Sequence, residues 1–146
     1  MALKRMDNVL VVVEDIDAAI EFFVELGMEL EGRTAIEGRW ADRVIGIDGA
    51  RSEIAMMRVP NGNGRLELTT FHSPAPIRSE PADAPVNALG IRRLMFAVDD
   101  LDEVLPRLRA RGAELVGEVV RFEDVYLLCY VRGPEGIMIG LAEELG

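Results

Sequence analysis

The chain contains the same pattern twice, and this repeat is the feature that most constrains its fold. Residues 6–30 (MDNVLVVVEDIDAAIEFFVELGMEL) align without a gap to residues 91–115 (IRRLMFAVDDLDEVLPRLRARGAEL). In each copy an apolar, strand-like run leads to aspartates, a helical stripe and a glycine. Such a repeat predicts two copies of one supersecondary unit. A site built on these units takes equivalent positions from both copies.

The segment after the aspartates of each copy has the periodicity of an amphipathic helix. Apolar side chains recur at i, i+3, i+4 and i+7, an aspartate can cap the first turn, and a glycine follows the last. Pro106 lies at or just past the first turn of the second helix, where a missing N–H becomes unfavourable. The expected buried stripes are Ile16, Ala19, Ile20 and Phe23 in the first copy and Leu101, Val104, Leu105 and Leu108 in the second.

Three strand-like segments follow each helix, so each copy predicts the order strand, helix and three strands. Turn sequences at residues 60–64 (PNGNG) and 133–136 (GPEG) indicate hairpins. Residues 39–49 leave two alternatives open, a short helix or a flap over a pocket. The predicted strands are residues 6–13, 28–33, 51–59 and 65–71 in the first copy, and a run of alternating residues near 93–98 followed by residues 114–122, 125–131 and 137–142 in the second.

The 146 residues predict one domain made of two modules. Module 1 covers about residues 5–71 and module 2 about residues 91–143. The proline-rich residues 72–90 between them suit an extended linker. We therefore expect a single domain of the α+β class over residues 1–146.

Composition excludes several classes of partner. The formal net charge of −10, from 26 acidic against 16 basic residues, argues against nucleic acids and anionic membranes, because binding to either depends on clustered positive charge. No apolar run approaches the roughly 18 residues of a membrane span. The first residues lack the apolar core of a signal peptide, and the single Cys129 excludes an internal disulfide. We expect a cytoplasmic protein, with Cys129 an inert buried thiol.

The duplicated unit resembles the vicinal oxygen chelate superfamily, which includes glyoxalase I, extradiol dioxygenases, fosfomycin-resistance transferases and bleomycin-binding proteins. The most specific pieces are the paired V-x-D-[IL]-D junctions and the closing VRGPEGIMIGLAEEL. The resemblance implies two tandem βαβββ modules whose sheets form a half-open cup. It also implies a homodimer, since related proteins often complete or pair their cups across two chains.

In that superfamily the cup holds a divalent metal through a His or Glu on the first strand of each copy and a Glu, Gln or His on the last. Matched residue by residue, these positions are Asn8, Glu67, Arg93 and Gly140. Divalent cations need anionic oxygen or imidazole donors, and only Glu67 supplies one. Arg93 carries a fixed positive charge and no acceptor. We therefore expect no metal and no other cofactor.

Arg93 has three open interpretations: a bidentate pair with Glu67, a contact to an anionic ligand, or a surface arginine on a wet strand. Because side chains alternate along strands, the mapped positions also predict the rest of the cup lining. The expected ligand-binding residues are Asn8, Leu10, Glu67, Thr69, Phe71, Arg93, Met95, Met138 and Gly140.

Three functions remain open from the sequence. The first is a metal-free protein that binds a small organic molecule, like the bleomycin-binding members. The second is a metal-independent enzyme with Glu67 as base and Arg93 as oxyanion stabiliser. The third is a metal-dependent lyase similar to lactoylglutathione lyase, which the ligand set disfavours. His72 is either an acid–base group at the cup mouth or an exposed histidine. Further candidate walls are Trp40, Met56 or Met57, Tyr126 and Tyr130.

Overall fold

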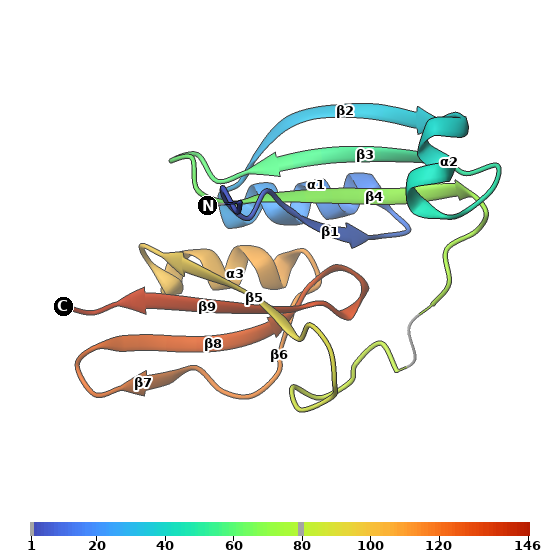
Figure 1. The fold of residues 1–146 in the computed structure, drawn as a ribbon. Helices are drawn as coiled ribbons and strands as arrows, with labels where there is room; N and C mark the ends of the chain where they lie inside the picture. The colour runs from blue at the N-terminus through green and yellow to red at the C-terminus, as the bar shows by residue number, and fades with distance from the viewer. Residues whose placement is uncertain (1, 79–80) are drawn as a thin grey trace. The chain divides into compact units, whose positions relative to one another are not determined.

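The computed structural model describes residues 2–78 and 81–146. Its contacts divide the chain into unit 1, which ends at Ile77, and unit 2, which begins at Arg78 (Figure 1). The boundary falls inside the predicted linker, residues 72–90, of which residues 79 and 80 lie outside the described residues.

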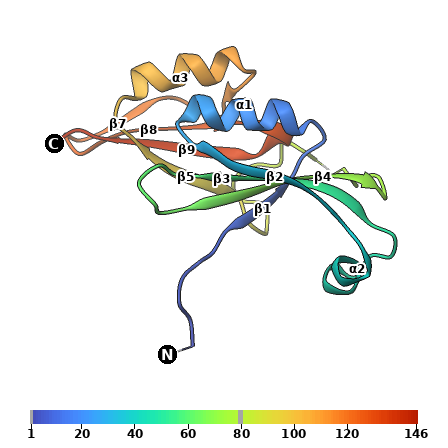
Figure 2. The same ribbon diagram turned by 90° about the horizontal axis from the view of Figure 1, so that it is seen from above.

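Unit 1 contains one mixed sheet, called sheet 1, with strand order β1-β4-β3-β2. The first strand runs parallel to β4, and the other neighbours are antiparallel. Figure 2 shows the two helices of this unit on opposite sides of the sheet. The elements are β1 (Val9–Val12), α1 (Ile16–Leu26), β2 (Glu29–Glu37), α2 (Arg39–Ile45), β3 (Arg51–Arg58) and β4 (Arg65–Ser73).

Unit 2 repeats this plan in sheet 2, with strand order β5-β9-β8-β6 and β7 paired to β8. Its first strand again runs parallel to its last, β9. The fold class is therefore confirmed as α+β with two tandem βαβββ modules. The elements are β5 (Arg93–Val98), α3 (Leu101–Ala110), β6 (Glu114–Leu115), β7 (Val120–Phe122), β8 (Tyr126–Arg132), a single 3₁₀ turn η1 (Pro134–Gly136) and β9 (Met138–Glu144).

The strand register confirms the internal alignment. In sheet 1, Leu10 of β1 lies beside Glu67 of β4. In sheet 2, Met95 of β5 lies beside Gly140 of β9. The sequence repeat already equates Leu10 with Met95, so Glu67 and Gly140 occupy equivalent places in the two units.

The repeated aspartates and glycines begin and end the helices as expected. The Asp15 carboxylate accepts a hydrogen bond from the Ala18 N–H at 3.0 Å, and the Asp100 carboxylate caps α3 in the same way. Gly27 and Gly112 follow the helices with φ of 121° and 96°, a region that side chains disfavour and glycine adopts freely. The cap and the end of each helix were therefore readable from local sequence.

Each helix covers one face of its own sheet. The predicted stripe of α1 is buried at Ile16, Ala19 and Phe23, and that of α3 at Leu101, Val104 and Leu108, whereas Ile20 and Leu105 are half-buried. The sheet residues under α1 are almost fully buried, and those of β9 under α3 have no exposed surface. These sheet residues are Val11, Val13, Ala55, Met57, Leu66 and Leu68 in unit 1 and Ile139 and Leu141 in unit 2.

Several element boundaries differ from the prediction because they depend on pairing. The first strand is shorter than residues 6–13, since only Val9–Val12 has a β4 partner. The second continues to Glu37 because it pairs with β3 beyond a bulge between Leu30 and Gly32. Residues 114–122 form two short strands instead of one, because pairing with β8 stops at the bend around Gly117.

The ambiguous residues 39–49 resolve into the helix α2, which ends at Gly46. The first two residues of the predicted linker belong to a strand, since β4 continues to Ser73. Its later part is attached to unit 2 by two arginines. Arg132 donates to the Ala84 carbonyl at 2.8 Å, and Arg92 donates to the same oxygen at 2.9 Å.

The structure also bears on membrane insertion. Of the helices formed by residues 2–78 and 81–146, none has the length and apolar character needed to cross a bilayer.

Candidate functional site

The face of sheet 1 opposite α1 carries the predicted lining residues of unit 1. We call it open face 1. Leu10 and Val12, on the edge strand β1, are 50% and 40% exposed there. Register places Met56 of β3 beside Glu67 and Ile54 beside Thr69 on the same face. Open face 1 consists of Leu10, Val12, Ile54, Met56, Glu67, Thr69 and Phe71.

Glu67 is the one anionic side chain among the predicted lining residues. It is half-buried, and its carboxylate accepts a long hydrogen bond of 3.4 Å from the Thr69 hydroxyl. Asn8 precedes β1 by one residue, and its amide donates to the neighbouring Asp7 carboxylate at 3.4 Å. Within unit 1, the described residues give Glu67 no cationic partner. Its pairing with Arg93, which belongs to unit 2, stays a prediction.

The corresponding face of sheet 2 carries the predicted lining residues of unit 2. We call it open face 2. Cross-strand register arranges it in rows, because paired residues on neighbouring strands point to the same side. Open face 2 consists of the rows Arg93–Met138–Arg132, Met95–Gly140–Tyr130 and Ala97–Ala142–Leu128. The charged residues therefore lie at one end and small apolar residues at the other.

Arg93 is held by an aromatic residue of the next row. Its Nε donates to the Tyr130 hydroxyl at 2.7 Å, and its guanidinium carbon lies 5.6 Å from the centre of the Tyr130 ring. Within the described part of unit 2, no carboxylate pairs with Arg93. The hydrogen bond uses one edge of the guanidinium and leaves the edge formed by the two Nη atoms unoccupied by these residues.

Gly140 is covered by a thioether. A Cβ atom at this position would overlap the Met95 Sδ and lie 3.2 Å from the Tyr130 ring. Met95 is 41% exposed, and Met138 of the first row is fully buried. The space that a larger side chain would need at Gly140 is thus taken by the end of a flexible apolar one.

These residues do not fit a divalent cation. Unit 1 brings one carboxylate and one neutral amide to the positions that the family uses, and unit 2 brings a guanidinium and a glycine. Among residues 2–78 and 81–146, no three His, Cys, Asp or Glu side chains are grouped so that they could hold a metal ion. The donor chemistry alone, with a permanent cation at one position and no donor at another, disagrees with a metal centre.

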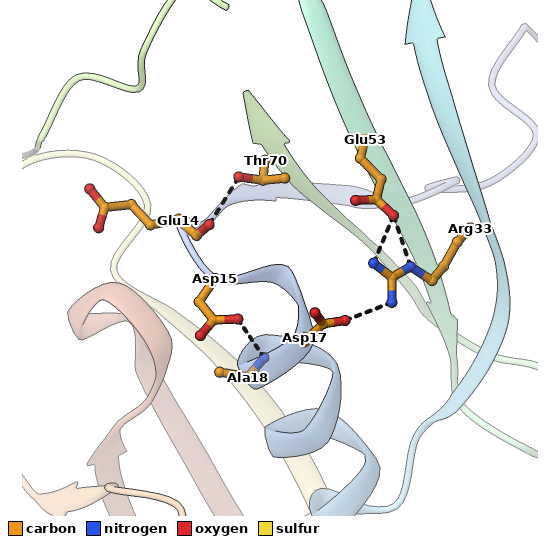
Figure 3. Close-up of polar contacts among 7 residues, drawn as sticks. All are labelled: Glu14, Asp15, Asp17, Ala18, Arg33, Glu53 and Thr70. Atoms are coloured by element: carbon orange, nitrogen blue, oxygen red, sulfur yellow. Dashed lines mark hydrogen bonds and ion pairs between the residues drawn. The ribbon is translucent and has the colours of Figure 1, made fainter. Parts of the chain in front are cut away.

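A concave region lies at the start of α1, and the sequence analysis did not predict it. Arg33 of β2 donates to Asp17 of α1 at 2.7 Å and to Glu53 of β3 at 2.9 and 2.7 Å (Figure 3). These hydrogen bonds raise the pKa of Arg33 above its usual value. The Thr70 hydroxyl donates to the Glu14 carbonyl at 3.1 Å beside them. The region encloses about 480 Å³ and is also lined by His72 and Pro76.

Three other residues singled out in the sequence, His72, Trp40 and Cys129, lie outside both open faces. His72 is exposed near the end of β4, at the rim of the concave region just described. Trp40 lies in α2 and is 62% exposed, with its ring against the Gly38 backbone. Cys129 is buried as predicted, and burial raises the pKa of its thiol. None of these residues belongs to either open face.

Sequence reasoning named Tyr130 as one possible wall and missed its role as the partner of Arg93. The GPEG turn contained a usable signal. A hairpin closed there brings Tyr130 opposite Gly140, next to the row of Arg93. The link from Asp17 to Arg33 and Glu53 left no local signal, because its members lie 16 and 20 residues apart.

Comparison with known proteins agrees with this architecture. The chain is 57% identical to a glyoxalase family protein from Bacillus cereus of known crystal structure, with a TM-score of 0.94 over 100% of this chain and 99% of that one. It is 25% identical to the uncharacterized protein YaeR of Escherichia coli over 99% of each chain. The trypanothione-dependent glyoxalase I of Leishmania major shares the fold, with a TM-score of 0.65 and 19% identity over 97% of this chain and 88% of that one.

The chain also matches a protein family as a whole. Residues 5–141 match the family profile, and this range contains both modules and every predicted lining residue. The chain therefore belongs to the Glyoxalase/Bleomycin resistance protein/Dioxygenase superfamily.

Proposed function

We propose that this chain binds a small organic molecule on its open sheet faces without the help of a divalent metal. The observation that carries the proposal is which residues occupy the two positions of unit 2 that correspond to metal ligands in the family. Arg93 presents a cation fixed by Tyr130, and Gly140 has the Met95 thioether in place of a donor side chain. A sheet face that keeps the family scaffold and lacks the metal donors suits ligands recognised by apolar contact and hydrogen bonds.

The exposed apolar residues support the same proposal. Leu10, Val12 and Met95 lie on the edge strands β1 and β5 and are each at least 40% exposed. Apolar side chains gathered with a few polar groups are the usual lining of a ligand site. Glu67 supplies the polar group in unit 1, where the buried Thr69 donates to its carboxylate. Arg93 and Tyr130 supply the polar groups in unit 2.

A ligand screen on chelator-treated protein tests this function. Thermal-shift and ligand-observed NMR measurements should find small organic molecules that bind equally well with and without added nickel, zinc, manganese or iron. Elemental analysis should find substoichiometric metal after dialysis. Tight uptake of one metal ion per chain, with ligand binding that depends on it, would contradict the proposal.

The same screen separates a binding protein from an enzyme. If a ligand is converted, Glu67 is the candidate base, because it is the carboxylate of the open faces. Glu67→Gln should then abolish turnover and keep binding, since the amide retains the shape of the carboxylate and loses its basicity. A ligand that stays unchanged in the wild-type protein, and binds Glu67→Gln with similar affinity, supports a binding role.

Two further expectations accompany this function. The homodimer implied by the resemblance stays a prediction, which light scattering coupled to size-exclusion chromatography measures directly. The cytoplasmic location expected from the sequence also stays a prediction.

A further inference from the structure

Open face 2 carries a charge that its own unit does not neutralise. In unit 2, Arg107 and Arg121 pair with Glu103 and Asp124 at 2.8 and 2.9 Å. Arg93 has instead an uncharged partner, the Tyr130 hydroxyl. Arg92 and Arg132 also lack a carboxylate partner, but their Nη atoms donate to backbone carbonyls. Arg93 differs because its Nη atoms have no such acceptor among the described residues of unit 2.

The geometry of Arg93 matches the recognition of an anion with two oxygens. A guanidinium binds carboxylates and phosphates through two parallel N–H donors on one edge. The bond from Nε to Tyr130 fixes the plane of the group, and the ring contact at 5.6 Å restricts it further. The Nη1–Nη2 edge is then presented with little conformational freedom left to lose on binding.

The neighbouring rows define what accompanies the anion. Met95 and Gly140 lie one row away from Arg93, and Ala97 and Ala142 lie two rows away. These side chains are apolar and small, apart from the flexible Met95. A thioether adapts to the shape of an apolar group and makes favourable contacts with aromatic rings. The surface beside Arg93 therefore suits the hydrocarbon or aromatic body of a small molecule.

Arg132 strengthens the positive end without competing for the ligand. It lies in the same row as Arg93, but its two Nη atoms donate to the backbone carbonyls of Asp83, Ala84 and Gly136 at 2.8–3.1 Å. Its hydrogen-bonding capacity is largely used, whereas its charge remains. Arg132 thus adds to the positive electrostatic potential at this end of open face 2. Of the two arginines in the row, Arg93 is the one with Nη donors left for a ligand.

We infer that Arg93 is the anion-binding residue of open face 2, that Tyr130 positions it, and that the ligand is a small organic carboxylate or phosphate with an apolar body over Met95 and Gly140. This inference rests on the proposed function and narrows it to a chemical class. It assigns no role to Glu67.

The test is an NMR titration of ¹⁵N-labelled protein with four probes that share one aromatic body: benzoate, phenyl phosphate, benzamide and benzyl alcohol. Benzoate or phenyl phosphate should shift the Arg93 Nε–H signal and the Gly140 amide, and the tighter of the two identifies the head group. Benzamide and benzyl alcohol should bind at least about 10-fold more weakly, because they lack the charge that strengthens the hydrogen bonds.

Variants assign the contact. Arg93→Met should weaken binding of the anion about 10- to 100-fold, and Arg93→Lys should recover part of the loss, because it keeps a point charge without the two-donor edge. Tyr130→Phe should move the Arg93 Nε–H signal in the free protein. It should also lower the affinity for the anion several-fold while the midpoint of unfolding stays unchanged. The matched control is Arg121→Met, which removes the same charge from the opposite face of sheet 2 and should change the affinity less than twofold.

The outcomes distinguish this inference from the proposed function. If benzamide binds as tightly as benzoate at open face 2, or if Arg93→Met binds the anion as well as the wild type, the inference is wrong and the binding function stands. If Arg93→Met does not fold, Arg93→Lys and Tyr130→Phe decide the question by the same criteria. If no probe binds and the wider ligand screen also finds nothing, both are wrong.

Discussion

Units 1 and 2 have one backbone plan and two different open faces. Both place a helix on one side of a sheet in which the first strand runs parallel to the last. At the equivalent inner positions, unit 1 pairs Leu10 with Glu67 and unit 2 pairs Met95 with Gly140. The scaffold was therefore kept through duplication while the chemistry diverged. One face retains an acidic group, and the other presents a cation and a flexible apolar residue.

The difference shows which positions a duplicated fold holds constant. The residues that begin each helix, fill its buried stripe and end it are the same or chemically similar in both units, because they determine whether the unit folds. The open-face residues carry no such constraint, since they contact solvent or ligand. Comparing variants at equivalent positions separates the two kinds of residue experimentally.

The largest effects are expected in the buried stripes, at the equivalent positions Phe23 and Leu108. Neither side chain has exposed surface. Phe23→Ala should lower the free energy of unfolding by about 3–5 kcal/mol, and Leu108→Ala by about 2–5 kcal/mol, from lost burial and the cavity that remains. Guanidinium denaturation followed by circular dichroism measures both. Val24→Ala, at a position that is 49% exposed, should change stability by no more than about 0.5 kcal/mol.

The equivalent open-face positions should respond differently to the same new side chain. Gly140→Ala should cost about 1–3 kcal/mol, because its Cβ overlaps Met95 and crowds the Tyr130 ring. Glu67→Ala should cost less than about 1 kcal/mol, because the group it removes makes one long hydrogen bond.

A double variant tests the cause of the Gly140 effect. Adding Met95→Ala to Gly140→Ala should recover part of the lost stability, giving a favourable coupling in the double-mutant cycle. Strictly additive effects would show that Met95 does not occupy the space over Gly140.

The helix caps should give smaller and unequal effects. Asp15→Ala should lower stability by about 1 kcal/mol through loss of the bond to the Ala18 N–H. Asp100→Ala should cost less, because α3 has a second acceptor at its start: Glu143 accepts from the Leu101 N–H at 2.7 Å. Thermal unfolding of the two variants and of the Asp100→Ala/Glu143→Ala double variant, which removes both acceptors, measures this. Equal losses at both caps would show that Glu143 contributes nothing.

Local sequence was sufficient for the caps, the buried stripes, the end of each helix and the hairpin turns, because each depends on residues a few positions apart. The resemblance to the family, rather than local sequence, placed Glu67 and Gly140 at corresponding positions, and the strand register agrees. Local sequence did not determine where β2 ends or that residues 114–122 form two strands, since both depend on which partner strand is present. The bond from Arg93 to Tyr130 joins residues 37 positions apart, and only the register of sheet 2 brings them together.

The smallest effect is expected at the other long-range contact, the link from α1 to sheet 1. Arg33 joins Asp17 and Glu53 at a partly exposed position, with 36% of its side chain accessible. Ion pairs in such surroundings contribute little, because water and salt screen them. Arg33→Met should lower the free energy of unfolding only slightly at low ionic strength, and the difference from wild type should shrink in about 0.5 M salt, because salt screens exposed charges. The matched variant Arg58→Met removes a single pair with Glu29 at 3.2 Å and should cost less still. If Arg33→Met instead destabilises the protein equally at low and high salt, the side chain acts by packing under the helix rather than by its charge. The two units would then differ in how their helices are attached as well as in the chemistry of their open faces.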